Sequence, residues 1–150
     1  MSIYPDHLRR LAIRAMKSYP GLYSDDALPL VLGTIAVESD GGTYLRQVGG
    51  GPALGIGQTE PVTFNWLRDV FADEYPALRN REFEELEWDL KLAIVMVRLR
   101  YRVVPEPLPS GYDLHAVAAY WKQYYNTPLG AGTVEEFARK YEMYVTEGGV

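Results

Sequence analysis

The chain has 150 residues with a net charge of −5, and 47% of them are hydrophobic. This length suits one domain, and the apolar fraction is enough to build a core without disulfides or structural metals. Cysteine is absent, which excludes a disulfide framework, a thiol nucleophile and a thiolate zinc site. The acidic charge disfavours a nucleic-acid partner, because proteins that follow a polyanion usually carry a basic surface.

The sequence predicts neither export nor insertion into a membrane. Residues 1–10 combine a tyrosine, a proline and an aspartate with two arginines and contain no apolar run, so no signal peptide is expected. The longest apolar stretch, 92–97, is too short to span a bilayer. We therefore expect a protein made in the cytoplasm. Its only histidines are His7 and His115, so no metal site is expected.

Hydrophobic periodicity predicts an all-helical chain, with two helices before residue 40. Apolar residues recur at spacings of three and four over 6–17, which is typical of an amphipathic helix. A second helix is expected to follow Asp26 as its N-cap, with Pro29 in the first turn, where a missing N–H does no harm. The apolar face of this helix leads directly to Glu38 and Ser39 at its C-terminal end.

The segment 41–58 breaks this helical pattern. It contains seven glycines and almost no periodicity, which predicts a long loop with room for a small hairpin at 44–48. Long ordered loops inside compact domains usually carry function.

Four more helices are expected downstream. They are predicted to begin near Thr59, Asn80, Asp113 and Thr133. The fourth helix should extend over 80–104, and its middle, 92–97, is apolar all round, as in a central buried helix that ends at Pro105. The fifth should reach about Tyr125. The sixth opens with a threonine and a glutamate spaced as a capping box.

Glu38 is the strongest candidate for chemistry. It lies on an apolar face at the C-terminal end of a helix, where desolvation and the negative end of the helix dipole both favour the protonated carboxyl. A carboxylic acid that is still protonated near neutral pH is what a glycosidase needs to protonate a leaving oxygen. The alternative is a solvated glutamate that ends an ordinary helix.

The residues after Glu38 resemble a known family. Glu38-Ser39 is followed by Gly42, then by 55–63 with the sequence GIGQTEPVT, and later by 125–127 and Gly130. This order resembles the lytic transglycosylase and goose-type lysozyme family, whose signature is Glu-Ser, then Gly-x-x-Gln-x-x-Pro-x-Thr, then Tyr-Asn followed closely by glycine. The segment 44–55 looks like the variant found in phage-encoded members.

The resemblance implies a single lysozyme-like domain over 1–150 that cleaves the β-1,4 bond between N-acetylmuramic acid and N-acetylglucosamine in peptidoglycan. Glu38 would act as general acid and then as general base, and no cofactor is implied. The residues expected to contact substrate or order the cleft are Ser39, Gln58, Tyr125 and Asn126. The family's Ala-Tyr-Asn-Ala-Gly block is split here by one further helical turn, so Tyr120 is an alternative to Tyr125 for the tyrosine role.

Two outcomes of catalysis stay open. In the transglycosylases the substrate supplies its own nucleophile, and the product is a 1,6-anhydro sugar. Hydrolysis would need a second carboxylate, for which Asp40 and Glu60 are the candidates. Asp40 is also expected as a turn residue before two glycines, and Glu60 as a first-turn charge on the third helix.

The resemblance also implies a setting and leaves a rival interpretation. A phage lysis or virion protein would reach the wall after release from the cytoplasm. The rival is a lysozyme-like phage structural or wall-binding protein with little activity. Trp66, Trp88 and Trp121 are expected mainly in the core, although Trp121 is close enough to two tyrosines to stack on a glycan. The arginines within 98–102 are expected as a solvated helix end.

Overall fold

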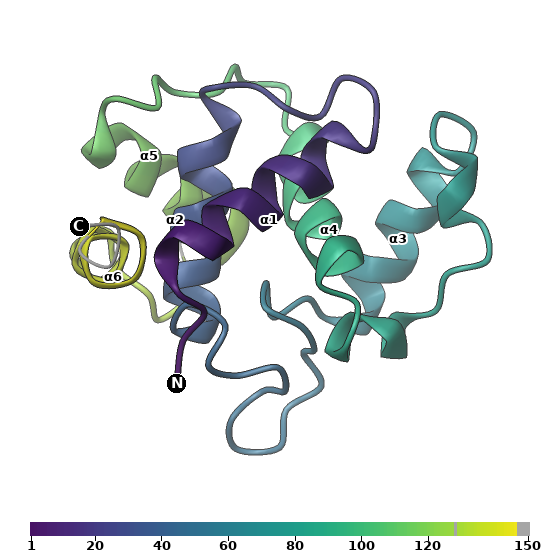
Figure 1. The fold of residues 1–150 in the computed structure, drawn as a ribbon, viewed down its shortest axis with the longest axis horizontal. Helices are drawn as coiled ribbons and strands as arrows, with labels where there is room; N and C mark the ends of the chain where they lie inside the picture. Colours follow the sequence, from purple (N-terminus) through teal and green to yellow (C-terminus); the bar gives the residue numbers. More distant parts are fainter. Residues whose placement is uncertain (128, 147–150) are drawn as a thin grey trace.

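The computed structural model describes residues 1–127 and 129–146, and these form an all-α fold, as predicted (Figure 1). The α-helices are α1 (Pro5–Lys17), α2 (Ala27–Ser39), α3 (Pro61–Phe71), α4 (Leu90–Arg102), α5 (Leu114–Trp121) and α6 (Val134–Tyr141). Short 3₁₀ turns occupy Pro76–Leu78 and Phe83–Glu87, and π-helical turns follow α5 and α6 at Lys122–Asn126 and Glu142–Thr146. Within the described ranges no helix is long and apolar enough to cross a bilayer.

Helix α2 lies at the centre of the core. It packs against α1, α4, α5 and α6, which surround it in Figure 1. All of its residues except Pro29 and Glu38 are buried, so the helix is covered on every side. The predicted apolar face is therefore only part of its buried surface. A polar side chain near its C-terminal end is placed at the edge of this core.

Asp26 occupies the N-cap position of α2, as predicted, but its side chain does not cap the helix. The hydroxyl of Ser24 accepts a hydrogen bond from the N–H of Ala27 at 3.0 Å, so Ser24 supplies the capping side chain. Asp26, the predicted cap, makes no such bond. Its carboxylate accepts from the N–H of Gly111 at 2.8 Å and ties the start of α2 to the loop before α5.

The predicted fourth helix is divided. A 3₁₀ turn covers Phe83–Glu87, and α4 begins only at Leu90 because Asp89 is its N-cap and accepts from the N–H of Leu92 at 2.9 Å. The middle of α4 is buried from 92 to 97, as predicted. The helix ends at Arg102, before the proline that was expected to stop it.

The glycine-rich segment is a loop that runs from the end of α2 to the start of α3 (Figure 1). The predicted hairpin within 44–48 does not form. Instead the N–H of Gln47 donates to Ala53 at 3.0 Å, and the N–H of Gly55 donates to Leu45 at 2.8 Å. These bonds form the antiparallel bridge between Arg46 and Leu54, and a second bridge joins Leu54 to Thr59, so the loop folds back on itself.

Three expectations about large side chains are corrected. Trp66 and Trp88 have exposed fractions of 46% and 67%, whereas Trp121 is buried with 1% exposed. Arg98 is not solvated either, because its Nε donates to the carbonyl of Leu22 at 2.8 Å in the interior. Trp66 and Trp88 therefore lie on the surface rather than in the core.

Gly33 should be intolerant of any side chain. A Cβ atom there would overlap the ring of Phe137, because α6 crosses α2 at this point. Glycine to alanine inside a helix normally stabilises by about 0.5–1 kcal/mol. Here we expect Gly33→Ala to lower the free energy of unfolding by about 1–3 kcal/mol, the usual effect of overpacking.

Urea unfolding of Gly33→Ala, Phe137→Leu and the double variant measures this effect. The double variant should lose less stability than the sum of the two single changes, because leucine leaves space for the added methyl group. A Gly33→Ala protein as stable as the wild type would contradict the close packing of α2 and α6.

Candidate active site

Glu38 lies in the last turn of α2 with its carboxyl group largely withdrawn from solvent. The indole Nε1 of Trp121, at the end of α5, donates a hydrogen bond to its Oε2 at 3.1 Å. Burial raises the pKa of Glu38 from its ordinary value of 4.5 to about 7, and the charge of Glu136 adds to the rise. The bond from Trp121 and the charge of Lys140 oppose it. The expected raised pKa is therefore present, with burial as its main cause.

Because its pKa is raised in the folded state, ionisation of Glu38 lowers the free energy of unfolding. The unfolded chain begins to lose this proton near pH 4.5, whereas the folded chain holds it to about pH 7. The contribution of this group to stability is therefore complete below pH 4.5 and is lost as the pH rises through 7. At 1.36 kcal/mol per pKa unit, the ionised carboxylate costs about 3 kcal/mol at alkaline pH.

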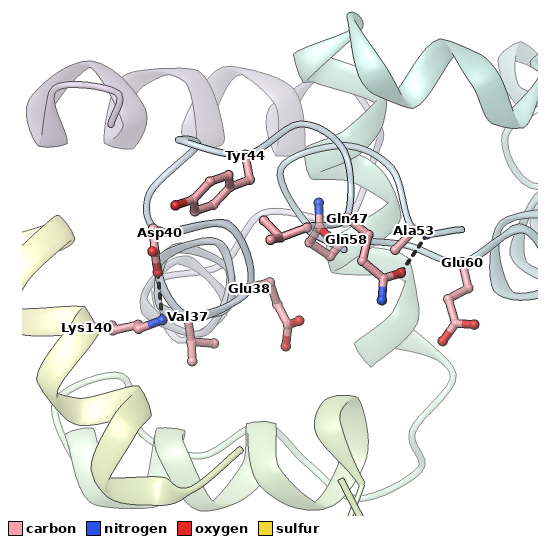
Figure 2. A pocket seen from close by; sticks show the side chains of 10 residues that line it. Val37, Glu38, Asp40, Tyr44, Gln47, Ala53, Gln58, Glu60 and Lys140 are labelled. Carbon is pink, nitrogen blue, oxygen red and sulfur yellow. Dashed lines mark hydrogen bonds and ion pairs between the residues drawn. The ribbon is translucent and has the colours of Figure 1, made fainter. Parts of the chain in front are cut away.

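The open side of Glu38 faces a cavity of about 430 Å³. The side chains that line it come from the end of α2, the glycine-rich loop and α6: Val37, Glu38, Asp40, Tyr44, Gln47, Val48, Ala53, Gln58, Glu60 and Lys140. Figure 2 shows Glu38 between the Asp40–Lys140 pair on one side and Gln58 and Glu60 on the other. The lining is polar with few aliphatic groups, which suits a hydroxyl-rich ligand.

Asp40, a candidate second carboxylate, is already paired. It caps the end of α2 in a left-handed conformation with φ of 51°, which turns the chain into the loop. Its Oδ1 accepts from Nζ of Lys140 on α6 at 2.7 Å, and both side chains are about three-quarters covered. Asp40 therefore has the turn role that its sequence context predicts, and a cation also neutralises its charge.

Gln58 lies on the wall of the cavity, as predicted. Its backbone has a φ of 50°, a conformation that non-glycine residues adopt only at a cost of about 1–3 kcal/mol. Its Nε2 donates to the carbonyl of Gly55 at 3.0 Å, so the side chain also orders the loop. Glu60, the other candidate carboxylate, is exposed on the rim at the N-cap position of α3, just outside the helix.

The structure separates the two candidate tyrosines. Tyr125 lies in the π-helical turn after α5, and its buried hydroxyl donates to the carbonyl of Gly57 at 2.6 Å. Burial raises the pKa of Tyr125, and the negative charge of Glu38 raises it further, so the two side chains are close enough to interact electrostatically. Tyr120 instead donates to the carbonyl of Glu106 at 2.9 Å, on another face. Of the two candidates, only Tyr125 lies near Glu38, and it lines a smaller cavity that shares Gln58 and Glu60 with the Glu38 cavity.

Ser39 and Asn126 hold the backbone around the site. Ser39 is fully buried, donates to the carbonyl of Ile35 and accepts from the N–H of Gly42, both at 3.0 Å. A side chain without exposed surface cannot contact a substrate, so the predicted contact from Ser39 is replaced by a role in the turn. Asn126 accepts from Nζ of Lys122 at 2.8 Å, which ties the end of the π-helical turn to its start.

Sequence reasoning missed three side chains at this site and the contact of a fourth, Trp121, with Glu38. Tyr44, Gln47 and Lys140 line the cavity, and Trp121 donates to Glu38. Trp121 follows Tyr120 in a recognised block, which was a usable signal. Nothing in the sequence indicated Lys140, which lies 100 residues from its partner Asp40.

Metal ligands and known relatives add no constraint on the site. In the part of the chain that the structure describes, no three histidine, aspartate or glutamate side chains gather as a possible metal site. Comparison with protein-family models found no matching model, and neither the curated proteins nor the solved structures gave a significant match. Function is therefore argued from the geometry and chemistry of the site.

Proposed function

We propose that the protein cleaves the β-1,4 glycosidic bond between N-acetylmuramic acid and N-acetylglucosamine in peptidoglycan, with Glu38 as the general acid and base. The observation that carries this proposal is a carboxyl group with a pKa of about 7 beside an open, polar cavity. Glycosidases depend on such a carboxylic acid. The Glu-Ser, Gly-x-x-Gln-x-x-Pro-x-Thr and Tyr-Asn blocks support the same substrate class and a lysozyme-like domain.

Glu38 can act both as the protonated acid and as the carboxylate, because neighbouring groups stabilise the ionised form once the proton has left. In the first step the carboxyl gives its proton to the glycosidic oxygen as the bond from that oxygen to C1 breaks. The carboxylate left behind accepts from Trp121 Nε1 and feels the positive charge of Lys140. In the second step this carboxylate takes a proton from the group that attacks C1, which restores the acid.

The arrangement of carboxylates favours the substrate's C6 hydroxyl as the attacking group. Asp40 is neutralised by Lys140, which weakens it as a base or nucleophile. Glu60 lies beyond Gln58, on the rim of the cavity and exposed (Figure 2). Neither of the two candidates therefore suits the role of second catalytic carboxylate, so the product is a 1,6-anhydro sugar and the enzyme is a lytic transglycosylase. The likeness of the segment 44–55 to phage-encoded members of the family supports a phage lysis or virion role.

Glu38→Gln should abolish clearing of purified peptidoglycan, because an amide cannot donate the proton. General acid catalysis contributes roughly 10²–10⁴ in rate. Turbidity clearance measures the loss, and Glu74→Gln, which removes an exposed carboxylate near Arg102, is the matched control and should clear normally. The Glu38→Gln change also removes a buried charge, so this variant should melt at a higher temperature than the wild type at pH 8.

Two results would contradict this assignment. Clearing by folded Glu38→Gln at the wild-type rate would remove Glu38 from the chemistry. A wild-type protein that binds walls without clearing them would favour the rival, a lysozyme-like structural or wall-binding protein. Mass spectrometry of the borohydride-treated digest identifies the product, since anhydro ends are lighter than reduced ends by one water and two hydrogens. If the digest contains only reducing ends, and the Glu60→Gln variant no longer produces them, the enzyme is a hydrolase that uses Glu60.

Tyr125→Phe should slow clearing more than Tyr120→Phe. Each change removes one hydroxyl that donates to a backbone carbonyl, so each should lower the free energy of unfolding by about 1 kcal/mol. Only the bond from Tyr125 holds Gly57, which precedes Gln58 on the cavity wall. Clearance rates and thermal unfolding are measured together for both variants. Equal activities at equal stability would remove Tyr125 from the site.

A further inference from the structure

A second cavity lies next to the Glu38 cavity, and we call the two cavities together the groove. Its volume is about 80 Å³, and it shares Gln58 and Glu60 with the first cavity. Its other lining residues come from the start of α3, the middle of α4 and the turn after α5: Thr59, Thr63, Met96, Arg100 and Tyr125. The two cavities are therefore adjacent, and a glycan chain that runs from Glu38 over Gln58 and Glu60 would reach the second one.

Arg100 brings a positive charge to this second cavity. Arg98 and Arg102 are four residues apart and lie on one face of α4, where they donate to the carbonyls of Leu22 and Gly21 at 2.8 and 3.2 Å. Arg100 lies two residues from each, and at 3.6 residues per turn this places it on the opposite face. The alternation in sequence therefore points Arg98 and Arg102 towards the segment 21–22 and Arg100 towards the second cavity.

The guanidinium of Arg100 is available to a ligand. Across residues 1–127 and 129–146, Arg100 takes part in none of the ion pairs or side-chain hydrogen bonds, whereas Arg102 pairs with Glu74 at 3.3 Å. No buried side-chain nitrogen or oxygen in the same ranges lacks a partner, so the unpaired nitrogens of Arg100 are accessible to solvent, and Arg100 is one of the residues that line the cavity. The hydroxyl groups of Thr59 and Thr63 line the same space and add hydrogen-bonding capacity.

We propose that Arg100 binds a carboxylate of the substrate, so that the groove selects acidic glycan over neutral glycan. This inference rests on the proposed function. A guanidinium presents a planar fork of donors that matches a carboxylate, and such charge-assisted pairs are about twice as strong as neutral hydrogen bonds. Peptidoglycan offers carboxylates on its stem peptides, or on the lactyl group where the peptide is missing. Chitin-like chains of N-acetylglucosamine carry none.

The charges around the groove make Arg100 the residue that distinguishes acidic glycan from neutral glycan. Glu38 and Glu60 face the groove, Asp40 is paired with Lys140, and the whole chain has a net charge of −5. Without Arg100 the groove would repel an acidic ligand. The guanidinium offsets this repulsion at one point, beyond Glu60, and thereby fixes the register of the substrate relative to Glu38.

Binding to three tetrasaccharides tests this selection in the Glu38→Gln background, where the substrate is not consumed. The ligands are a peptide-bearing peptidoglycan fragment, the same fragment without peptides, and neutral chitotetraose, each measured by calorimetry. We expect tighter binding of an acidic fragment than of chitotetraose. Adding Arg100→Gln should weaken acidic binding roughly tenfold or more and leave chitotetraose unchanged. Arg100→Lys should recover part of the loss, because it keeps the charge without the fork.

Arg102→Gln is the matched control, since it removes one arginine from the same helix outside the groove, and it should leave all three affinities unchanged. The fragment that shows the larger Arg100 effect identifies the carboxylate as peptide or lactyl. If the three ligands bind with equal affinity and Arg100→Gln changes none of these affinities, this inference is wrong while the proposed function stands. Binding of none of them would overturn both this inference and the proposed function.

Discussion

The site depends on the burial of the Glu38 carboxyl at the end of a helix that the core covers on every side. Gly33 lets the ring of Phe137 approach α2, Phe137 packs against Trp121 with ring centroids 5.3 Å apart, and Trp121 donates to Glu38. Packing of α2, α5 and α6 is thereby transmitted to one carboxyl group. If these helices separated, water would reach Glu38 and its pKa would fall towards the ordinary value.

Two unfavourable features lie next to one another at this site. The ionised Glu38 is destabilised by burial, and Asp40 and Gln58 both hold left-handed backbone conformations with φ of 51° and 50°. Strained residues persist where the surrounding structure determines their conformation, and they gather at functional sites. The buried core around α2 and α4 provides the stability that offsets them. The Lys140–Asp40 pair and the Gln58–Gly55 bond hold the strained residues in place.

The sequence was informative where the determining interactions are local. Periodicity located the helices, and the residue pattern at the end of α2 was enough to place Glu38 on a desolvated face. The break between 87 and 90 was missed because a capping aspartate outweighed a continuous helical pattern. The hairpin was placed wrongly because glycine-rich segments carry little register information.

Contacts between distant segments could not be predicted in the same way. The neutralisation of Asp40 requires α6 to pack beside α2, and the role of Trp121 requires the end of α5 to meet the end of α2. The position of Tyr125 depends on a π-helical turn that the residue pattern does not encode. Arg100 is different, because the helical period alone separates it from Arg98 and Arg102, and that signal was missed.

Direct titration of the Glu38 carboxyl tests the central claim. The side-chain carboxyl carbons of glutamate can be labelled with ¹³C and followed by NMR from pH 3 to pH 9, with Glu38→Gln identifying the resonance. The account predicts a midpoint near 7 for Glu38, because burial stabilises the neutral acid more than Trp121 and Lys140 stabilise the anion. A midpoint near 4.5 would show an ordinary solvated carboxylate, and Glu38 would then be unable to serve as the acid at neutral pH.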